Sequence, residues 1–584
     1  MSIEELHAMG LSEAQARWML ARYREQALTI ARSDPFRLAE EVPGVGFVTA
    51  DEIAARLGLK EDAPGRLRAG TLRALRDAAD EGHTCLARNH LVQEAQALLQ
   101  VERRLVARTI DEMAGEGAVI AEGPAPGIER DPWVYLPSLH AAEVGTAGIL
   151  RSLARAEVNR PPFPAEPEQE TAIVRAQAEA GIALAPAQLE AVRAALGRRL
   201  VVITGGPGTG KTTVLKILLT ACRQRGIHAL LAAPTGRGAR RMAETTGWEA
   251  RTIHRLLEYA PGRGFQRNGG RPLQCDLLVV DEASMVDISL AHRLLEALPT
   301  GCGLLLVGDA NQLPSVGPGQ LLRDIIASGA ASVVELTEIF RQAGESGIVA
   351  NANRILLGLS PEEDLTRSDR DFLFVERPDP DRAVSAIVEL VRDRIPRRLS
   401  VDPIDGVQVL LPMHRGTAGA TAVNRALQDA LNPSGAPLRR GDGLFDRESP
   451  RFRIGDKVMQ RRNDYEKGVF NGDIGRITAA EAGTVHVVFD GDPVEYADEE
   501  LYGLDLAYAL SVHKSQGSEY PAIVLGLLDE HAAMLQRSLL YTALTRARKL
   551  AVIVGSRSAL RTAVRRGNTR SRSSGLVERL RSER

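Results

Sequence analysis

The sequence predicts an α/β protein with two tandem parallel sheets and a helical region in front of them. From about residue 182 onward, short apolar runs lead into glycine-rich turns and helical stretches, as in RRLVVITGG and CDLLVVDEAS. The same alternation returns near the C-terminus in AIVLGLLDE and KLAVIVGS. Strands that alternate with helices in this way are typical of parallel sheets. The two separate groups of such strands therefore indicate two sheets.

The first 150 residues predict a set of small helical units. They are rich in Leu, Ala, Arg and Glu and are broken by short Gly and Pro turns. Within them, Val42, Val45 and Val48 surround a PGVG turn in the helix-hairpin-helix pattern. The backbone N–H groups of such a turn can hold a DNA phosphate without reading bases. A helical hairpin that only packs against its neighbours is the alternative. Residues 66–140 hold further helices and a strand-like end, VYLPSLH, which suits a winged helix.

Three further segments complete the organisation of the chain. The stretch NRPPFPAEPEQE is Pro-rich and acidic, which is typical of a linker. Between the sheets, short strands and tight turns at 471–473 and 490–492 predict a small β-barrel. The Arg-rich C-terminus is expected to be a solvated or frayed tail. The predicted divisions are the helical region 1–150, the linker 151–180, the first sheet domain 181–342 (with a hairpin insertion at about 258–275), the second sheet domain 343–440 and 501–560, the barrel 441–500 and the tail 561–584.

Composition excludes several classes of protein. With 44% apolar and 25% charged residues, the chain has ordinary globular composition, and its net charge of −2 argues against binding nucleic acid by overall basicity. Any nucleic-acid contact must come from local basic surface. The four cysteines form no C-x-x-C pair, so neither zinc nor a disulfide framework is indicated, and a reducing compartment fits best. No run of 18 apolar residues and no signal-peptide pattern occurs, which predicts a cytoplasmic protein without a membrane partner.

One loop carries a strong phosphate-binding signal. VVITGGPGTGKTT contains G-x-x-x-x-G-K-T from Gly205 to Thr212, between an apolar strand and a helical stretch. In this P-loop pattern, backbone N–H groups converge on the β- and γ-phosphates of ATP, and Lys211 adds a positive charge there. The predicted ATP-binding residues of the loop are Gly206, Pro207, Gly208, Thr209, Gly210, Lys211, Thr212 and Thr213.

A carboxylate pair at a second strand end completes the predicted hydrolytic site. LLVVDEAS offers Asp281 to Mg²⁺, together with the Thr212 hydroxyl. Glu282 is then placed to orient or deprotonate the attacking water. These elements predict ATP hydrolysis, but many NTPases share them, so they leave open what the hydrolysis drives.

Further motifs connect this site to a second domain. Gln312, in GDANQLPSVGPG, follows a strand, where its amide can sense the γ-phosphate or the attacking water. Arg341, in LTEIFRQ, and Arg546, in YTALTRAR, are candidate arginine fingers contributed from across a cleft. A surface ion pair is the alternative for either arginine taken alone.

Seven motifs in this order carry a family resemblance. With Gln188, GGPGTGKTT, DEAS, GDANQLPSVGPG, TEIFRQ, HKSQGSEY and YTALTRAR, the chain resembles the superfamily 1 helicases, and within them the RecD-like branch with a helical N-terminal extension. The resemblance implies two RecA-like P-loop motor domains that bind ATP and Mg²⁺ between them and single-stranded DNA across their top. It also implies that the barrel is an SH3-like insertion in the second motor domain and that the 258–275 hairpin is a strand-separating pin.

The resemblance also implies roles for individual residues. Gln188 would read the adenine edge, Glu519 would bind the ribose side of the nucleotide, and both arginine fingers would contact the γ-phosphate. DNA contacts would come from hydroxyls, short cationic groups and backbone N–H groups at the C-terminal ends of strands. These residues are Pro234, Thr235, Arg237, Thr252, His254, His414, Arg415, His513, Lys514 and Ser515. For each histidine, a structural imidazole is the alternative.

The sequence thus predicts an ATP-dependent DNA helicase that acts in DNA repair or recombination. It is expected to translocate 5′ to 3′ on single-stranded DNA and to unwind duplex at single-strand/double-strand junctions as a monomer. The polarity and the monomeric state come from the resemblance, and no motif indicates a protein partner. A superfamily 1 RNA helicase and an ATP-switched DNA-binding protein without unwinding activity are the alternatives. The helix-hairpin-helix pattern favours DNA, and the complete motif set favours a motor.

Overall fold

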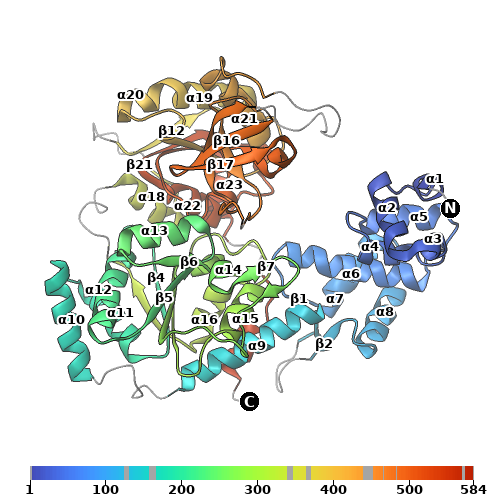
Figure 1. Cartoon of the computed structure of the whole chain (residues 1–584), viewed down its shortest axis with the longest axis horizontal. Helices are drawn as coiled ribbons and strands as arrows, with labels where there is room; N and C mark the ends of the chain where they lie inside the picture. The colour runs from blue at the N-terminus through green and yellow to red at the C-terminus, as the bar shows by residue number, and fades with distance from the viewer. Residues whose placement is uncertain are drawn as a thin grey trace.

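The computed structural model shows two stacked sheet domains with a helical region projecting to one side (Figure 1). The structure describes residues 3–123, 130–156, 166–338, 346–362, 370–438, 452–464, 466–481, 483–567 and 572–582. In this part of the chain, none of the helices has both the length and the apolar character needed to span a bilayer.

The N-terminal region begins with five short helices. They are α1 (Ile3–Ala8), α2 (Glu13–Tyr23), α3 (Ala27–Ser33), α4 (Pro35–Glu41) and α5 (Phe47–Arg56). The turn between α4 and α5 needs glycine, because Gly44 has a positive φ of 78°. Val42 and Val45 are buried beneath this turn, whereas Val48, which the pattern grouped with them, is 65% exposed. The buried stripe of α5 consists instead of Phe47, Ala50, Ile53 and Ala54, so Val48 lies on the outer face of the helix.

Three longer helices and a small sheet follow. The helices are α6 (Pro64–Asp80), α7 (Arg88–Leu99) and α8 (Arg103–Gly115), and the strands are β1 (Cys85–Ala87), β2 (Ile120–Glu122) and β3 (Trp133–Tyr135). The strands form an antiparallel sheet in the order β1-β3-β2. The winged-helix assignment of this unit stays a prediction.

The first sheet domain, which the resemblance implies is the first motor domain, contains a six-stranded parallel sheet in the order β11-β4-β10-β9-β5-β6. Its strands are β4 (Leu200–Gly205), β5 (Ala229–Ala233), β6 (Ala250–Thr252), β9 (Leu277–Val280), β10 (Gly303–Gly308) and β11 (Ser332–Leu336). Neighbouring residues of β4 point into different cores, since Val202 packs under one layer of helices and Val201 under the other. Burial on both faces explains the continuous apolar runs in these strands.

Helices cover both faces of this sheet. One layer contains α9 (Pro137–Arg155), α15 (Ile288–Glu296) and α16 (Leu321–Ser328), and the other contains α10 (Glu166–Ala180), α11 (Pro186–Gly197), α12 (Lys211–Gln224) and α13 (Gly236–Thr246). The short helix α14 (Ile253–Leu256) precedes a two-stranded hairpin, β7 (Tyr259–Ala260) and β8 (Gly264–Phe265), in the segment predicted as an insertion.

The second sheet domain, which the resemblance implies is the second motor domain, contains a five-stranded parallel sheet in the order β12-β21-β20-β13-β19. Its strands are β12 (Phe372–Glu376), β13 (Val407–Leu411), β19 (Ala509–Ser511), β20 (Tyr520–Leu527) and β21 (Ala547–Gly555). Its helices are α18 (Gly347–Leu356), α19 (Pro380–Glu389), α20 (Ile395–Leu399), α21 (Ala420–Leu431), α22 (Arg537–Leu544) and α23 (Arg557–Arg565).

The barrel is a five-stranded antiparallel sheet in the order β17-β16-β15-β14-β18. Its strands are β14 (Lys457–Gln460), β15 (Ile474–Glu481), β16 (Thr484–Phe489), β17 (Asp492–Ala497) and β18 (Leu504–Leu506). Its last strand therefore lies beyond the predicted end at residue 500. The barrel shares one apolar core with the second sheet, in which Ile477 and Val487 join Val409 and Val524.

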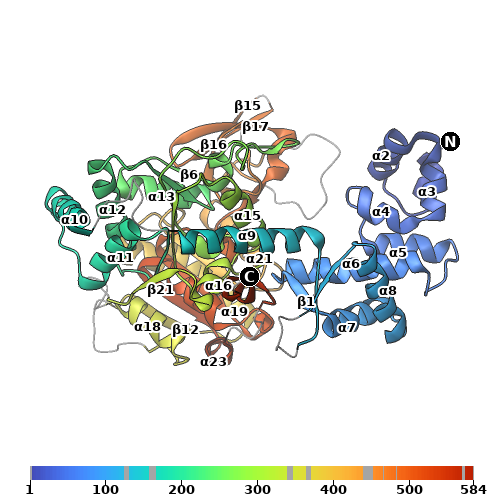
Figure 2. The same ribbon diagram turned by 90° about the horizontal axis from the view of Figure 1, so that it is seen from below.

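The predicted linker 151–180 is wrong in part. Its start falls inside α9, which packs on α15 along the first sheet, and Figure 2 shows α9 running from the N-terminal region across the motor domain. Its second half forms α10, which packs on α12. Ala172, Ile173 and Ala176 are buried at helical spacing. The Pro-rich, acidic composition just before this stripe concealed it.

The prediction of a frayed C-terminal tail is also wrong. Helix α24 (Leu576–Arg581) packs against α16 and α9, and its Leu576 and Leu580 side chains are buried. These two leucines, four residues apart, form one apolar stripe. The many arginines around them concealed that stripe.

We expect Leu576→Ala to loosen the tail. The fully buried side chain fills a packed site, so its truncation should lower the free energy of opening α24 by about 2 to 5 kcal/mol. Amide hydrogen exchange of α24 measures this change. The control is Leu357→Ala, because Leu357 is 76% exposed and its truncation should leave exchange unchanged. Equal exchange in wild type and Leu576→Ala would mean that the tail is undocked in solution.

Candidate nucleotide and nucleic-acid sites

The P-loop connects the buried strand β4 to helix α12. Gly208 and Gly210 have φ values of 75° and 82°, which only glycine adopts without strain. The Lys211 ammonium donates to the carbonyl oxygens of Gly205 (2.6 Å) and Gly206 (2.8 Å), so it lies inside the curve of the loop. The α12 N-terminus, which begins at Lys211, adds backbone N–H groups and a positive dipole end. The loop therefore has the form of an anion cradle.

Gln188 lies beside this loop. Its side chain is buried, its Nε2 donates to the Thr209 carbonyl (3.2 Å), and its Oε1 accepts from the Ala185 N–H (3.2 Å). The structure thus places Gln188 at the predicted nucleotide site. Its contact with adenine stays a prediction.

Asp281 and Glu282 follow strand β9. The Asp281 N–H donates to the Ala232 carbonyl (2.9 Å), and its carboxylate accepts from the Glu282 N–H (2.8 Å). Burial and the Glu282 charge raise the pKa of Asp281 to about 6. Glu282 has a positive φ of 52°, an uncommon conformation for a residue with a side chain. The backbone here is held in a strained turn that presents both carboxylates at the strand end.

Strand order explains why these residues meet. Strand β10 lies between β4 and β9, and the parallel strands all end at the same edge of the sheet. The P-loop, Asp281 and the loop after β10 therefore form a row. In that third loop, Gln312 Nε2 donates to Asp309 Oδ2 (3.3 Å), and Gln312 Oε1 is buried without a hydrogen-bond partner among the described residues. An amide oxygen in this position can accept a hydrogen bond from an attacking water.

Side chains of the second motor domain hydrogen-bond to residues of the loop after β10. The Tyr541 hydroxyl donates to Asp309 Oδ2 (2.7 Å), the Leu313 N–H donates to Thr542 Oγ1 (2.9 Å), and Gln516 Nε2 donates to the Leu313 carbonyl (2.9 Å). A Cβ on Gly206 of the P-loop would lie 3.1 Å from the Tyr541 oxygen. Tyr541 and Thr542 lie in YTALTRAR and Gln516 in HKSQGSEY, but the sequence predicted no role for these three side chains.

The predicted phosphate-contacting arginines are placed unequally. Arg546 is buried, and its guanidinium donates to the Thr542 carbonyl (3.1 Å), the Ser518 carbonyl (3.2 Å) and Thr545 Oγ1 (3.2 Å). Arg341 lies outside the described residues. Contact of either arginine with a γ-phosphate stays a prediction.

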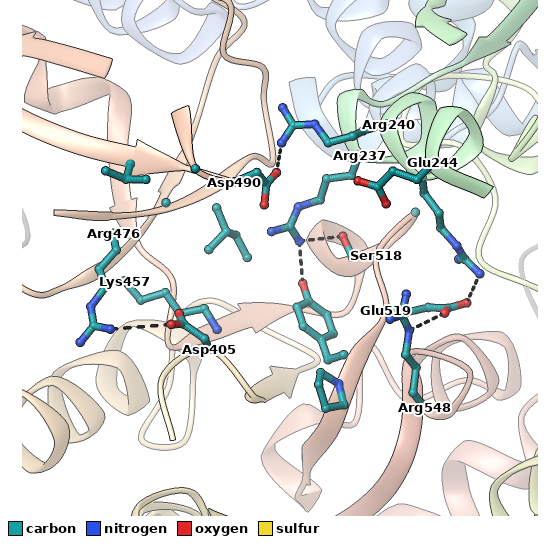
Figure 3. Close-up of a pocket in the computed structure, with 18 of the residues that line it drawn as sticks. Arg237, Arg240, Glu244, Asp405, Lys457, Arg476, Asp490, Ser518, Glu519 and Arg548 are labelled. Carbon is teal, nitrogen blue, oxygen red and sulfur yellow. Dashed lines mark hydrogen bonds and ion pairs between the residues drawn. The ribbon is translucent and has the colours of Figure 1, made fainter. Parts of the chain in front are cut away.

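A cleft of about 780 Å³ opens between α13, the barrel and the second sheet (Figure 3). Glu519 lies in it and pairs with Arg241 (2.7 Å) and Arg548 (3.0 Å), so its ribose contact also stays a prediction. Arg237, which the resemblance assigned to DNA, lies in this cleft too. Its guanidinium donates to Ser518 Oγ (2.9 Å) and the Tyr520 hydroxyl (3.2 Å). In this structure Arg237 therefore connects the two motor domains.

Four of the predicted DNA residues share a second cleft, of about 390 Å³. The first motor domain contributes the predicted Pro234, Thr235, Thr252 and His254. The barrel contributes residues that sequence reasoning missed, namely Arg461, Arg462, Asn463, Phe470 and Asn471. The pairing of cations with an aromatic ring is typical of a single-strand path. In the sequence, the basic pair in RRN (Arg461 and Arg462) and the aromatic residue in VFNG (Phe470) could have indicated this surface.

The predicted histidines have lowered pKa values. Burial lowers the pKa of His254, whose ring packs on Tyr259 (5.7 Å between centroids) and Phe265 (5.5 Å) of the hairpin. Burial and neighbouring positive charges lower the pKa values of His414 and His513. A lowered pKa disfavours the charged form of these rings, so they are poor sources of counter-charge for phosphates.

The remaining predicted DNA residues differ in accessibility. The Ser515 side chain is fully buried and donates to the Val512 carbonyl (2.8 Å), so its hydroxyl faces the protein. Lys514 pairs with Asp505 (3.3 Å), and Arg415 is exposed. Of these three residues, Arg415 alone has an exposed side chain with no ion pair to another residue that the structure describes.

Family models match four parts of the chain. A model described as the ATP-dependent RecD2 DNA helicase HHH domain matches residues 1–85, and one described as the ATP-dependent RecD-like DNA helicase SH3 domain matches residues 423–489. An AAA domain model matches residues 188–318, and a UvrD-like helicase C-terminal domain model matches residues 506–554. These matches fall on the helix-hairpin-helix unit, the barrel and the two motor domains.

Relatives with assigned names match as well. The chain is 36% identical to the ATP-dependent RecD2 DNA helicase of Deinococcus radiodurans, over 99% of this chain and 77% of that protein. It is 33% identical to the RecBCD enzyme subunit RecD of Mycobacterium tuberculosis, over 68% of this chain and 73% of that one. Among solved structures, Bacteroides Pif1 bound to single-stranded DNA is 23% identical with a TM-score of 0.40, covering 64% of this chain and 92% of that one.

The two parallel sheets, the P-loop and carboxylate pair at one edge of the first sheet, and the matching family models and named relatives define an ATP-dependent DNA helicase of superfamily 1. More narrowly, the chain belongs to the RecD2 family of ATP-dependent DNA helicases. The predicted resemblance, fold class and enzymatic activity are thereby confirmed.

We expect Lys211→Gln to abolish ATP hydrolysis while sparing DNA binding. The substitution removes the positive charge from the phosphate cradle, so kcat should fall by about 100-fold or more. Steady-state ATPase assays with and without single-stranded DNA, together with a DNA-binding titration, measure both effects. Lys216→Gln, on the exposed face of the same helix, is the matched control and should behave as wild type. DNA-stimulated turnover by Lys211→Gln would contradict the site assignment.

Proposed function

We propose that this helicase translocates 5′ to 3′ on single-stranded DNA and opens duplex at single-strand/double-strand junctions as a monomer. The observation that carries the proposal is the set of hydrogen bonds between the Asp309–Leu313 loop and the second motor domain. These bonds connect the loop next to Asp281 and Glu282 to the second motor domain, which must move during translocation. The polarity rests on membership of the RecD-like branch, and a role in DNA repair or recombination fits the same membership.

In this proposal ATP lies between the two motor domains. Lys211 and the loop N–H groups bind its phosphates, and Glu282 accepts a proton from the attacking water. Gln312 positions that water through its unpaired Oε1. Arg341 and Arg546 contact the γ-phosphate, and Gln188 and Glu519 bind the base and the ribose.

The donor set at the P-loop fits Mg²⁺. Thr212 lies in the first turn of α12 and Asp281 at the end of β9, and both offer the hard oxygen donors that this cation prefers. Among the described residues no cluster of three or more His, Cys, Asp or Glu could hold a metal ion. A P-loop site needs only one carboxylate, because the hydroxyl and the nucleotide phosphates supply the other ligands. Bound there, the cation neutralises phosphate charge. Burial raises the pKa of Asp281, and a cation would favour its ionised form.

In the proposed translocation, the space between the two motor domains and the cleft proposed to bind DNA change shape together. ATP binding draws Arg546 towards the γ-phosphate, which closes the two motor domains on the nucleotide and shifts the second domain along the DNA. Hydrolysis removes the γ-phosphate that holds the domains together, so the domains move apart again. Because the barrel forms one wall of the DNA cleft and shares its core with the second motor domain, the grip on DNA changes with each closure.

Two partial duplexes test the polarity. One carries a 5′ single-stranded tail and the other a 3′ tail of the same sequence, and strand displacement is followed with ATP and Mg²⁺. We expect unwinding of the 5′-tailed duplex alone, since a 5′ to 3′ motor loaded on that tail runs into the duplex.

The Lys211→Gln variant on both substrates controls for passive melting. Unwinding of the 3′-tailed duplex alone would contradict the proposed polarity. DNA-stimulated ATPase without unwinding of either duplex would contradict the proposed action at junctions.

A further inference from the structure

The end of the chain returns to the nucleotide-sensing loop. Arg572 begins the last described segment of the chain (572–582) and lies against residues 315–319, the second half of the loop that carries Gln312. Its guanidinium donates to the carbonyls of Ser315 (2.7 Å), Gly317 (3.0 Å) and Gly319 (2.6 Å) and to Ser315 Oγ (3.1 Å). The Arg572 side chain is thus hydrogen-bonded to three carbonyl groups within five consecutive residues.

These bonds stabilise an otherwise irregular loop. Ser315 is buried, and a buried carbonyl without a donor costs free energy. Arg323 of α16 serves the first half of the loop in the same way, since it donates to the carbonyls of Ala310 (2.6 Å) and Gln312 (3.1 Å). Two arginines therefore hold the loop, one from the same domain and one from the C-terminal tail. Burial and the nearby Arg323 lower the pKa of Arg572 to about 10, which leaves it charged at neutral pH.

The N-terminal region meets the same guanidinium. Gly82 has a positive φ of 97°, and a Cβ at this position would overlap the Arg572 guanidinium. The Gly319 N–H donates to the Gly82 carbonyl (2.9 Å), and the Thr84 N–H donates to the Ser573 carbonyl (2.9 Å). Three segments that are far apart in the sequence, namely 82–84, 315–319 and 572–573, therefore form one junction.

Buried Glu143 of α9 anchors the tail next to this junction. Its carboxylate is fully buried and accepts from Thr84 Oγ1 (2.7 Å), the Gly575 N–H (3.1 Å) and Arg579 Nε (3.0 Å). Tyr135 and Ser574 also donate to it. A buried carboxylate with this many donors fixes the groups around it, so the tail has one position relative to both α9 and the N-terminal region.

We propose that Arg572 is a positioning residue for ATP hydrolysis: it holds the loop so that Gln312 faces the nucleotide. Gly82, in contact with the Arg572 guanidinium, links this positioning to the N-terminal region. Arg572 binds the carbonyls of residues 315–319 in this loop, and the Asp309–Leu313 part of the loop is hydrogen-bonded to the second motor domain. Without the Arg572 hydrogen bonds, the loop can move away from the P-loop. The inference rests on the proposed role of Gln312 in orienting the attacking water.

Arg572→Ala tests the positioning role. We expect DNA-stimulated kcat to fall by about 10-fold, because small misplacements of a positioned group cost this much or more. The KM for ATP should stay within about two-fold, since the P-loop is untouched. Arg572→Lys should recover part of the rate, and added guanidinium at a non-denaturing concentration should partly rescue Arg572→Ala. Arg581→Ala is the matched control, because exposed Arg581 lies in the same tail and donates to the Ala327 carbonyl, outside the loop.

Gly82→Ala tests the link from the other side. The new methyl group displaces the guanidinium without removing it, so the variant should show the same kcat loss with little change in KM. Gly117→Ala controls for backbone strain, because Gly117 also has a positive φ (75°) but a Cβ there would meet no atom within 4 Å. Gly117→Ala should keep wild-type kcat.

Several results would overturn the inference. If Arg572→Ala keeps wild-type kcat while Gln312→Ala loses it, Arg572 does not position the loop. If Arg581→Ala loses as much kcat as Arg572→Ala, or guanidinium and Arg572→Lys give no recovery, the tail acts only by general stabilisation. If Gly82→Ala behaves like Gly117→Ala, the N-terminal link is wrong. Wild-type kcat in Gln312→Ala would instead refute the proposed function on which the inference rests.

Discussion

The hydrogen bonds between the Asp309–Leu313 loop and the second motor domain are the interaction on which the molecule depends. A nucleotide can drive movement only if the residues that sense it are bonded to a body that can move. Here Tyr541 and Thr542 of α22 reach the loop after β10, beside the P-loop. Burial raises the pKa of Tyr541, which keeps its hydroxyl protonated as the donor to Asp309. In the proposed cycle, the barrel, which shares its core with the second motor domain, carries the movement of that domain to the cleft proposed to bind DNA.

Much of the motor could be predicted from the sequence, because its chemistry is local. The P-loop needs glycines at Gly208 and Gly210, a lysine and a hydroxyl within eight residues, so a short pattern contains the whole site. Asp281 and Gln312 follow apolar strands, and parallel strands end at a common edge. That rule was sufficient to predict that these side chains meet. The order of β4, β10 and β9 did not follow from the sequence, and it explains why Gln312 lies between the other two.

The remaining features depend on pairings between distant residues. Nothing in YTALTRAR indicates that Tyr541 contacts Asp309 or that Arg546 bonds within its own domain. Arg237 looked like a DNA contact because of its motif, yet its partners Ser518 and Tyr520 lie more than 280 positions away. The tail was misread because arginines dominate its composition, whereas Leu576 and the carbonyls that Arg572 binds decide its structure. Composition describes solvent exposure on average, and a few buried contacts override it.

A double-mutant cycle between Asp309 and Tyr541 tests the central claim most directly. DNA-stimulated kcat is measured for wild type, Asp309→Asn, Tyr541→Phe and the double variant. If the hydrogen bond couples hydrolysis to the second domain, each single variant should be impaired. The double variant should then be no worse than the more impaired single one, which corresponds to a coupling free energy of about 1 kcal/mol or more. Single effects that add within about 0.3 to 0.5 kcal/mol would show that the two residues act independently and would contradict the account.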